Sequence, residues 1–86
     1  MYNLEIEEEV SKTFKKLLKK DKKQLEAVNK KIEQMVLDPF QFKPLRRPLE
    51  GLRRVHVGSF VLVYAVVENP STVKIVKYTH HDNAYL

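Results

Sequence analysis

The chain ends with residues that can transfer protons. Its final segment, VKIVKYTHHDNAYL, places His80, His81, Asp82 and Tyr85 directly after a strand-like run. An imidazole titrates near neutral pH and can therefore act as an acid or a base. A tyrosine adds a weakly acidic hydroxyl and a ring on which a nucleobase stacks. Because almost any polar tail would serve as a chain end, this ending indicates a chemical role.

Cationic side chains form two further groups that suit a phosphate ligand. Arg54 and His56 lie together in the segment RRVHV. An arginine guanidinium keeps its charge and donates paired hydrogen bonds to phosphate oxygens. The formal net charge of +5 favours a polyanion or an acidic protein as partner. The alternative is that the basic residues are only solvated surface charge and that His56 is a structural residue of an edge strand. The other candidate phosphate-binding cations are Lys43, Arg46, Arg47, Arg53 and Lys74.

A metal site is the rival interpretation of the HHD run. Adjacent side chains in an extended strand point in opposite directions, so we do not expect His80 and His81 to bind one ligand together. A single helical turn at the chain end would bring His81 and Tyr85 to one side and turn His80 away. The chain has no cysteine to supply a thiolate ligand. We therefore expect no metal and no other cofactor.

Two common classes of enzyme site have no motif in this sequence. The chain contains neither a glycine-rich phosphate loop nor a serine nucleophile elbow. Nucleotide hydrolysis and acyl transfer are therefore not expected.

The first half of the chain predicts one short strand and two helices. Residues 2–6 alternate at strand spacing, and residues 7–20 carry apolar side chains at helical spacing between initial glutamates and final lysines. Asp21 and Gln24 have the spacing of a capping box, which predicts a second helix. Pro39 cannot continue its hydrogen bonds, so this helix ends near residue 37, and the two helices form an antiparallel hairpin.

The second half predicts a basic arm followed by three strands. The arm, residues 39–51, is rich in proline and is not expected to form a regular element. The middle strand is apolar almost throughout, which is typical of a central strand covered on both faces. The fold class is therefore α+β, in the order β-α-α-β-β-β, with a helical hairpin packed on a mainly antiparallel sheet. The three strands are predicted at residues 53–57, 60–68 and 71–78.

Alternation along the first of these strands decides where its polar residues lie. If Val55 and Val57 face the helices, Arg54 and His56 point to the open side of the sheet. In a three-stranded meander, the end of the last strand approaches that side or the arm. We therefore expect one basic concavity.

Size and composition set the domain count and the compartment. With 86 residues, 43% of them hydrophobic, we expect residues 1–86 to form a single domain. The absence of cysteine is typical of a reducing compartment. No segment has the length and apolar character of a signal peptide or membrane span. We expect a cytoplasmic protein that does not associate with membranes.

Four features together resemble one known superfamily over nearly the whole chain. They are the β-α-α-β-β-β order, the arm KPLRRPLEG, the segment LRRVHVGSFVLVY and the ending THHDNAY. This combination resembles the RelE/ParE superfamily of toxins from toxin–antitoxin systems, most closely the compact archaeal RelE-type proteins. In the family pattern, Arg54 and His56 stand at two arginine positions, His81 stands where an arginine is common, and Tyr85 matches a tyrosine near the C-terminus.

The sequence departs from the family pattern at one cation and at its end. A tyrosine-arginine pair usually opens the next strand, and here it is Phe60-Val61. The C-terminal helix of some relatives is also not expected here, since one residue follows Tyr85. The cations that could replace the missing arginine are Arg46, Arg47, Arg53 and Lys74.

The resemblance implies an mRNA interferase, a metal-independent endoribonuclease that cuts messenger RNA on the ribosome and inhibits translation. It also implies a cognate RelB-like antitoxin, through which the complex binds operator DNA. The expected reaction is transesterification by a ribose 2′-hydroxyl, with Arg54, His56, His81 and Tyr85 as catalytic residues. Two alternatives remain: a ParE-like toxin that blocks DNA gyrase without cutting RNA, and a non-catalytic RNA-binding module.

Overall fold

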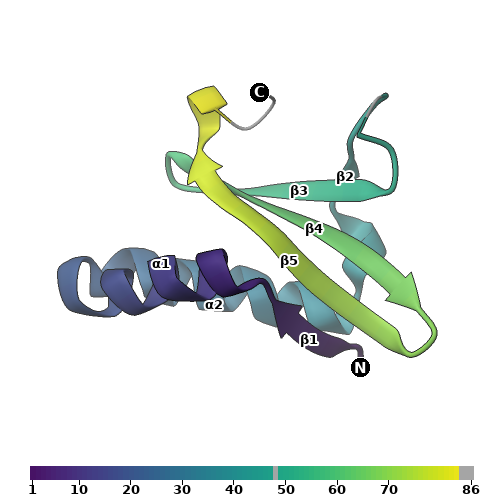
Figure 1. The fold of residues 1–86 in the computed structure, drawn as a ribbon, viewed down its shortest axis with the longest axis horizontal. Coiled ribbons are helices and arrows are strands. Elements are labelled where there is room, and N and C mark those ends of the chain that lie inside the picture. Colours follow the sequence, from purple (N-terminus) through teal and green to yellow (C-terminus); the bar gives the residue numbers. More distant parts are fainter. Residues whose placement is uncertain (48, 84–86) are drawn as a thin grey trace.

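The computed structural model describes residues 1–47 and 49–83, in which two helices cover one face of a five-stranded sheet (Figure 1). The strand order is β1-β5-β4-β3-β2, with β1 parallel to β5 and the other neighbours antiparallel. This arrangement confirms the predicted α+β fold. The elements are β1 (Asn3–Ile6), α1 (Glu8–Lys20), α2 (Lys22–Leu37), the 3₁₀ turn η1 (Pro39–Gln41), β2 (Lys43–Pro44), β3 (Leu52–Val57), β4 (Phe60–Glu68), β5 (Ser71–His80) and the 3₁₀ turn η2 (His81–Asn83).

Only one of the two hydrogen bonds of the predicted capping box forms at the start of α2. Asp21 Oδ1 accepts a hydrogen bond from the backbone N–H of Gln24 at 3.1 Å. The Gln24 side chain does not complete the predicted capping box. Its Nε2 instead donates to the carbonyl oxygen of Val57 and to the hydroxyl of Tyr78, both at 2.9 Å. These competing partners lie on the sheet, Val57 buried and Tyr78 partly buried, so Gln24 fastens the first turn of α2 to β3 and β5.

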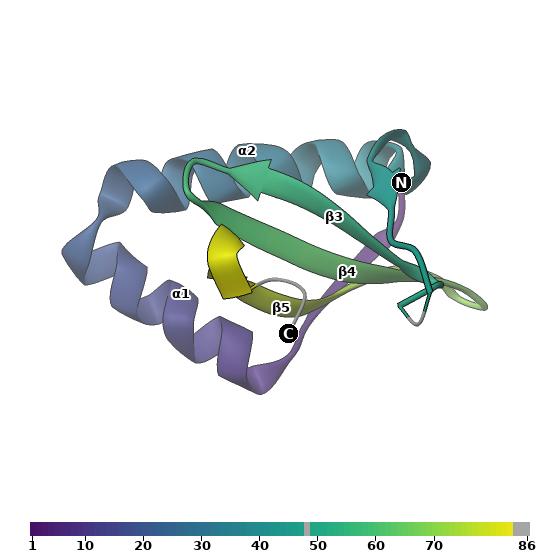
Figure 2. The ribbon, with the colours of Figure 1, turned by 90° about the horizontal axis from the view of Figure 1, so that it is seen from above.

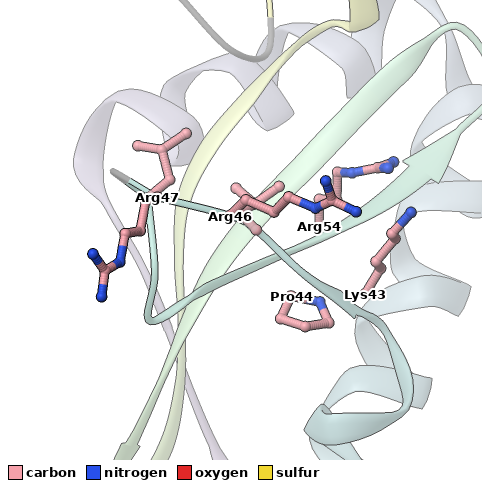
Figure 3. Close-up of a pocket in the computed structure, with 7 residues that line it drawn as sticks. Lys43, Pro44, Arg46, Arg47 and Arg54 are labelled. Carbon is pink, nitrogen blue, oxygen red and sulfur yellow. The ribbon is translucent and has the colours of Figure 1, made fainter.

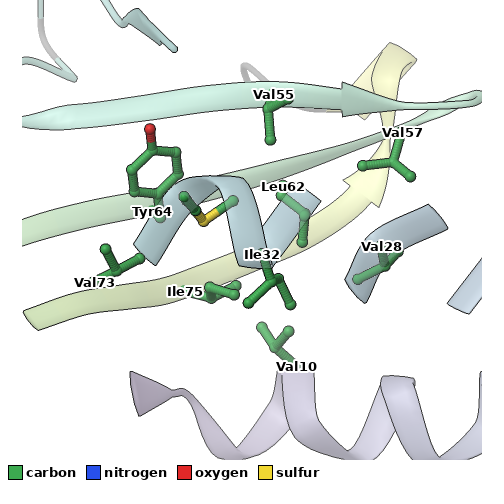
Figure 4. Close-up of a cluster of buried hydrophobic side chains, with 10 residues drawn as sticks. Val10, Val28, Ile32, Val55, Val57, Leu62, Tyr64, Val73 and Ile75 are labelled. Atoms are coloured by element: carbon green, nitrogen blue, oxygen red, sulfur yellow. The ribbon is translucent and has the colours of Figure 1, made fainter. Parts of the chain in front are cut away.

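The main core lies between the helices and the sheet (Figure 4). Val55 and Val57 of β3 point into it, which fixes the face on which their neighbours lie. Tyr64 is fully buried, and its hydroxyl donates a 2.5 Å hydrogen bond to the carbonyl oxygen of Pro39. Burial raises the pKa of Tyr64 to about 12. The buried members of this core are Val10, Val28, Ile32, Met35, Val55, Val57, Leu62, Tyr64, Val73 and Ile75.

Strand β4 is covered on both faces, as its apolar sequence predicts. Leu62 and Tyr64 face the helices. Val61 and Val63 face the opposite way and form a second, smaller core with Leu45, Leu52 and Val76. The open face of the sheet, meaning the face opposite the helices, is therefore partly apolar.

The arm is more regular than the sequence predicts. Its residues Lys43–Pro44 form β2, which pairs with β3 opposite Arg54 and Arg53. The backbone N–H of Leu45 then donates to the carbonyl oxygen of Leu52 at 2.9 Å. Leu45 of the arm and Leu52 at the start of β3 are partly buried against Val61 and Val63 of β4, and this apolar contact holds a proline-rich segment against the sheet.

The arm and the C-terminal turn both stand on the open face, at different ends of β3. Figure 1 shows η2 near the β3–β4 turn and the arm at the start of β3, with both helices on the other side of the sheet. Figure 2, from above, shows the same separation. Strand β5 runs to His80, two residues further than predicted. No helix in the described ranges is long and apolar enough to cross a membrane.

Candidate active site

Arg54 and His56 are in direct contact on the open face of β3. Arg54 Nη1 lies 2.6 Å from His56 Nε2, and the buried Val55 between them confirms the predicted orientation. A guanidinium can only donate hydrogen bonds, so His56 Nε2 must be the acceptor. This geometry requires an imidazole without a proton on Nε2. The pair thus combines a fixed positive charge with a proton acceptor.

A basic pocket of about 290 Å³ lies between the arm and β3. Lys43 stands directly opposite Arg54 in the strand pairing, and side chains at such positions are about 5 Å apart. Figure 3 shows Lys43, Arg46 and Arg54 gathered on one side of the pocket. Close like charges favour an anionic ligand. The lining residues are Lys43, Pro44, Leu45, Arg46, Arg47, Leu49 and Arg54.

Arg47 lies at this pocket but points away from the other cations (Figure 3). Its side chain is 91% exposed, and its Nε lies 3.5 Å from a carboxylate oxygen of Glu50. An exposed pair of this kind holds a side chain weakly. Arg47 therefore contributes charge to the surface rather than a fixed position.

The structure does not bring Arg53 and Lys74 to the pocket lining. Arg53 faces the opposite side of β3, where its Nη1 donates to the carbonyl oxygen of Phe42 at 2.7 Å and its guanidinium carbon lies 5.0 Å from the ring centre of Phe40. Lys74 lies on β5, opposite Ala65. An RNA-binding role for these two residues stays a prediction, and the geometry gives Arg53 a structural one.

The two histidines at the end of β5 are turned toward each other. The ring centres of His80 and His81 are 4.4 Å apart. Asp82 Oδ1 lies 3.0 Å from His81 Nε2, and Oδ2 lies 3.4 Å from His80 Nδ1. The prediction that the two side chains diverge is wrong. The strand ends at His80 and the chain turns into η2, which removes the alternation on which that prediction depended.

His81 is attached to the β3–β4 turn. The carbonyl oxygen of Ser59 accepts the backbone N–H of His81 at 2.9 Å and lies 3.0 Å from its Nδ1. His80 packs edge-on against Phe60, with ring centres 5.6 Å apart. The chain end is therefore fixed as far as His81, while Tyr85 lies outside the described residues.

The candidate residues form two groups rather than one pocket. No histidine belongs to the described lining of the basic pocket. His56 lies in register with Val61, and Val61 with Thr79, so about 10 Å separates the backbones of His56 and Thr79 across two strand spacings. His81 follows two residues later. The two groups share the open face: the pocket lies toward the start of β3, His81 lies at the β3–β4 turn, and His56 lies between them, one residue before the end of β3.

Sequence reasoning missed the residues that shape these groups. Leu45 and Leu49 line the pocket together with the cations, and Ser59 anchors His81 through its backbone. The leucine spacing in PLRRPLEGL is a possible signal for an arm that folds back onto the sheet. A backbone carbonyl carries no sequence signal, so Ser59 could not have been found.

Comparison with known proteins identifies the family. A family described as "ParE toxin of type II toxin-antitoxin system, parDE" matches residues 4–85. The chain belongs to this toxin family. The toxin is also 48% identical over 86 residues to "Putative toxin RelE4" of Methanocaldococcus jannaschii, a match that covers 99% of this chain and 92% of that protein. These matches confirm the predicted RelE/ParE membership.

Two solved structures share the toxin's fold. The YoeB/ParE toxin from Agrobacterium tumefaciens aligns with a TM-score of 0.83 at 17% identity, over 92% of this chain and 98% of that one. A chain of the RelBE2 toxin–antitoxin complex from Mycobacterium tuberculosis aligns with a TM-score of 0.77 at 26% identity, over 93% of this chain and 98% of that one. The predicted RelE-like fold is therefore confirmed.

Proposed function

We propose that this toxin is an endoribonuclease that cuts messenger RNA on the ribosome. The observation that carries the proposal is the 2.6 Å contact between Arg54 Nη1 and His56 Nε2 at the edge of a pocket lined by four cations. A phosphate bound there would meet both a fixed charge and a proton acceptor. These are the groups that cleavage of an RNA backbone requires.

The proposed reaction begins with His56 as the base. Its Nε2 takes the proton of a ribose 2′-hydroxyl, and the 2′-oxygen attacks the adjacent phosphorus. Arg54 turns from His56 to the phosphate oxygens and stabilises the charge that develops on them. The bond between phosphorus and the 5′-oxygen then breaks. The products are a 2′,3′-cyclic phosphate and a 5′-hydroxyl.

His81 is the proposed acid. Its Nδ1 lies 3.0 Å from a carbonyl oxygen and its Nε2 lies 3.0 Å from a carboxylate oxygen, and both of these atoms only accept hydrogen bonds. The position thus suits an imidazolium, which can give a proton to the leaving 5′-oxygen. Tyr85 is proposed to stack on a base or orient it. Side chains supply the base, the acid and the positive charge, so the proposed reaction needs no metal.

The pocket cations are proposed to hold the RNA rather than to react with it. Lys43 and Arg46 face the same space as Arg54 (Figure 3). Contacts to phosphate position a nucleic acid without reading its sequence. Codon preference would then depend on the ribosome and on Tyr85 rather than on the pocket.

A cognate RelB-like antitoxin is the proposed partner that restrains this activity. The related RelBE2 structure is a toxin–antitoxin complex, and the net charge of +5 favours an acidic partner. The complex is proposed to bind operator DNA through the antitoxin. Free expression of the toxin without growth arrest, and without a tight partner in pull-downs, would contradict this proposal.

One comparison separates cleavage from gyrase inhibition, the alternative for a ParE-like toxin. The purified toxin is added in parallel to a cell-free translation reaction and to a gyrase supercoiling assay. We expect truncated message in the first reaction and unchanged supercoiling in the second. Intact message with blocked supercoiling would favour the gyrase alternative, and RNA binding without either effect would favour a binding module.

A further inference from the structure

We propose that His80, His81 and Asp82 form a binding site for a divalent transition-metal ion of the Zn²⁺ type. Each residue offers one ligand atom, and these atoms lie within 4.8 Å of one another. The predicted divergence of the two histidines was the geometric argument against such a site. The structure removes that argument, because the two rings lie 4.4 Å apart.

The carboxylate of Asp82 lies between the two imidazoles. Its Oδ1 is 3.0 Å from His81 Nε2 and its Oδ2 is 3.4 Å from His80 Nδ1. Ligands at about 2.0–2.2 Å from a tetrahedral zinc ion are spaced on the order of 3.3 Å apart. The ligand atoms, which lie within 4.8 Å of one another, must therefore move closer together around the ion, and the backbone N–H of Asp82, 3.3 Å from His80 Nδ1, must turn away from that nitrogen. The negative charge also offsets part of the ion's charge.

Contacts from outside the three residues hold both rings in place. The Ser59 carbonyl oxygen is 3.0 Å from His81 Nδ1, so a proton on Nδ1 leaves the lone pair of Nε2 directed to the ion. Phe60 packs edge-on against the His80 ring at 5.6 Å between centres and 77° between planes. Such outer contacts fix the tautomer and orientation of metal-binding histidines. Here they come from the β3–β4 turn and the start of β4.

The set of ligand atoms selects the class of ion. Two imidazole nitrogens and one carboxylate oxygen suit Zn²⁺, Ni²⁺ and Cu²⁺, whereas Mg²⁺ and Ca²⁺ prefer oxygen ligands. Three protein ligands leave a fourth position for water. The exposed positions of His81 and Asp82 allow the ion to enter from solvent.

If the proposed function also holds, the ion acts as an inhibitor. Zn²⁺ on His81 Nε2 replaces the proton that this residue would give to the leaving oxygen. This consequence rests on the proposed function, but the ion site itself does not. Measurement of binding without RNA therefore keeps the two proposals distinguishable.

The test is Zn²⁺ binding to the untagged full chain, measured by competition with a chromophoric chelator. We expect one Zn²⁺ per chain and no binding of Mg²⁺. Binding should weaken by at least about tenfold in His80→Ala, His81→Ala and Asp82→Asn. The matched control is His56→Ala, which removes the third histidine of the chain and should leave binding unchanged. Circular dichroism confirms that each variant is folded.

A second measurement needs no variant. In NMR spectra of the wild-type chain, Zn²⁺ should shift the imidazole signals of His80 and His81 and leave those of His56 in place. Equal shifts of all three histidines, or full binding by a folded His80→Ala/His81→Ala double variant, would overturn the proposal. So would the absence of binding at micromolar Zn²⁺.

Discussion

Arg53 and Arg54 are adjacent on β3, and their side chains lie on opposite faces of the sheet. Arg53 Nη1 donates to the carbonyl oxygen of Phe42 at 2.7 Å, and Arg54 Nη1 lies 2.6 Å from His56 Nε2. Strand alternation separates the two guanidiniums. Arg53 fastens the first part of the arm at Phe42, and Arg54 faces the proposed phosphate site.

This relationship predicts that replacing Arg53 mainly lowers stability, whereas replacing Arg54 mainly lowers cleavage. Arg53→Ala removes a charge-assisted hydrogen bond and should lower the free energy of unfolding by about 1.5–3 kcal/mol. Arg54→Ala should leave stability within about 1 kcal/mol and lower message cleavage by about 10²-fold or more. Urea unfolding and cleavage are measured for both variants. Equal loss of cleavage in two equally stable variants would contradict the assignment.

Arg47→Ala should differ from Arg54→Ala although both residues lie at the pocket. Arg47 is exposed and paired only weakly with Glu50, so its loss removes charge without disturbing a fixed contact. RNA affinity should fall to a similar extent for all sequences, and the slope of log affinity against log salt should fall by about 1 or less. Cleavage that drops as far in Arg47→Ala as in Arg54→Ala would show that bulk charge alone matters.

His56→Ala and His81→Ala should each slow cleavage by about 10²–10⁴-fold without abolishing it, since that is the usual contribution of general acid–base catalysis. His80→Ala is the matched control, because His80 packs on Phe60 and has no proposed part in the reaction. Single-turnover rates are compared in metal-free buffer. A loss in His80→Ala as large as that in His81→Ala would argue for a structural role of the whole tail.

The buried hydroxyl of Tyr64 predicts a loss of stability at alkaline pH. Burial raises its pKa to about 12, above the ordinary value of about 10 in an unfolded chain. The folded state therefore holds this proton more tightly, and the resulting stabilisation is complete below pH 10 and lost as the pH rises toward 12. At about 1.4 kcal/mol per pKa unit, the loss amounts to about 2–3 kcal/mol.

Tyr64→Phe isolates this effect. The variant should be less stable by about 1 kcal/mol at pH 7, where it lacks the hydrogen bond to Pro39, and its unfolding free energy should fall less steeply above pH 10. Urea unfolding from pH 7 to 11.5 gives both slopes. Parallel curves for the two proteins would exclude Tyr64 as the source of the alkaline loss.

The elements of the fold could be predicted because their signals are local. Capping at Asp21, the proline after α2 and alternation around Val55 each depend on neighbouring residues. The Gln24 side chain could not be placed in the same way. Its partners, Val57 and Tyr78, are distant in sequence, and the sheet offers it part-buried acceptors that a local capping rule does not consider.

The candidate site was predictable only in part, for the same reason. Arg54 and His56 share a strand face, so their contact follows from spacing. The convergence of His80 and His81 depends on where β5 stops and η2 begins, and the backbone bond from His81 to Ser59 then holds His81 at the β3–β4 turn. The pocket depends on the packing of Leu45, in the arm, and Leu52 against Val61 and Val63 of β4. This contact joins residues that are distant in sequence, and the proline-rich composition of the arm does not predict it.

The most direct test of the account is the chemistry of the cut ends. Translating ribosomes are incubated with the toxin, and the 3′ ends of the message are mapped and analysed for their phosphate. The account predicts cleavage with a 2′,3′-cyclic phosphate on one fragment and a 5′-hydroxyl on the other, at a rate reduced by about 10²–10⁴-fold in His56→Ala. Intact message at saturating toxin, or full cleavage by folded His56→Ala, would contradict it.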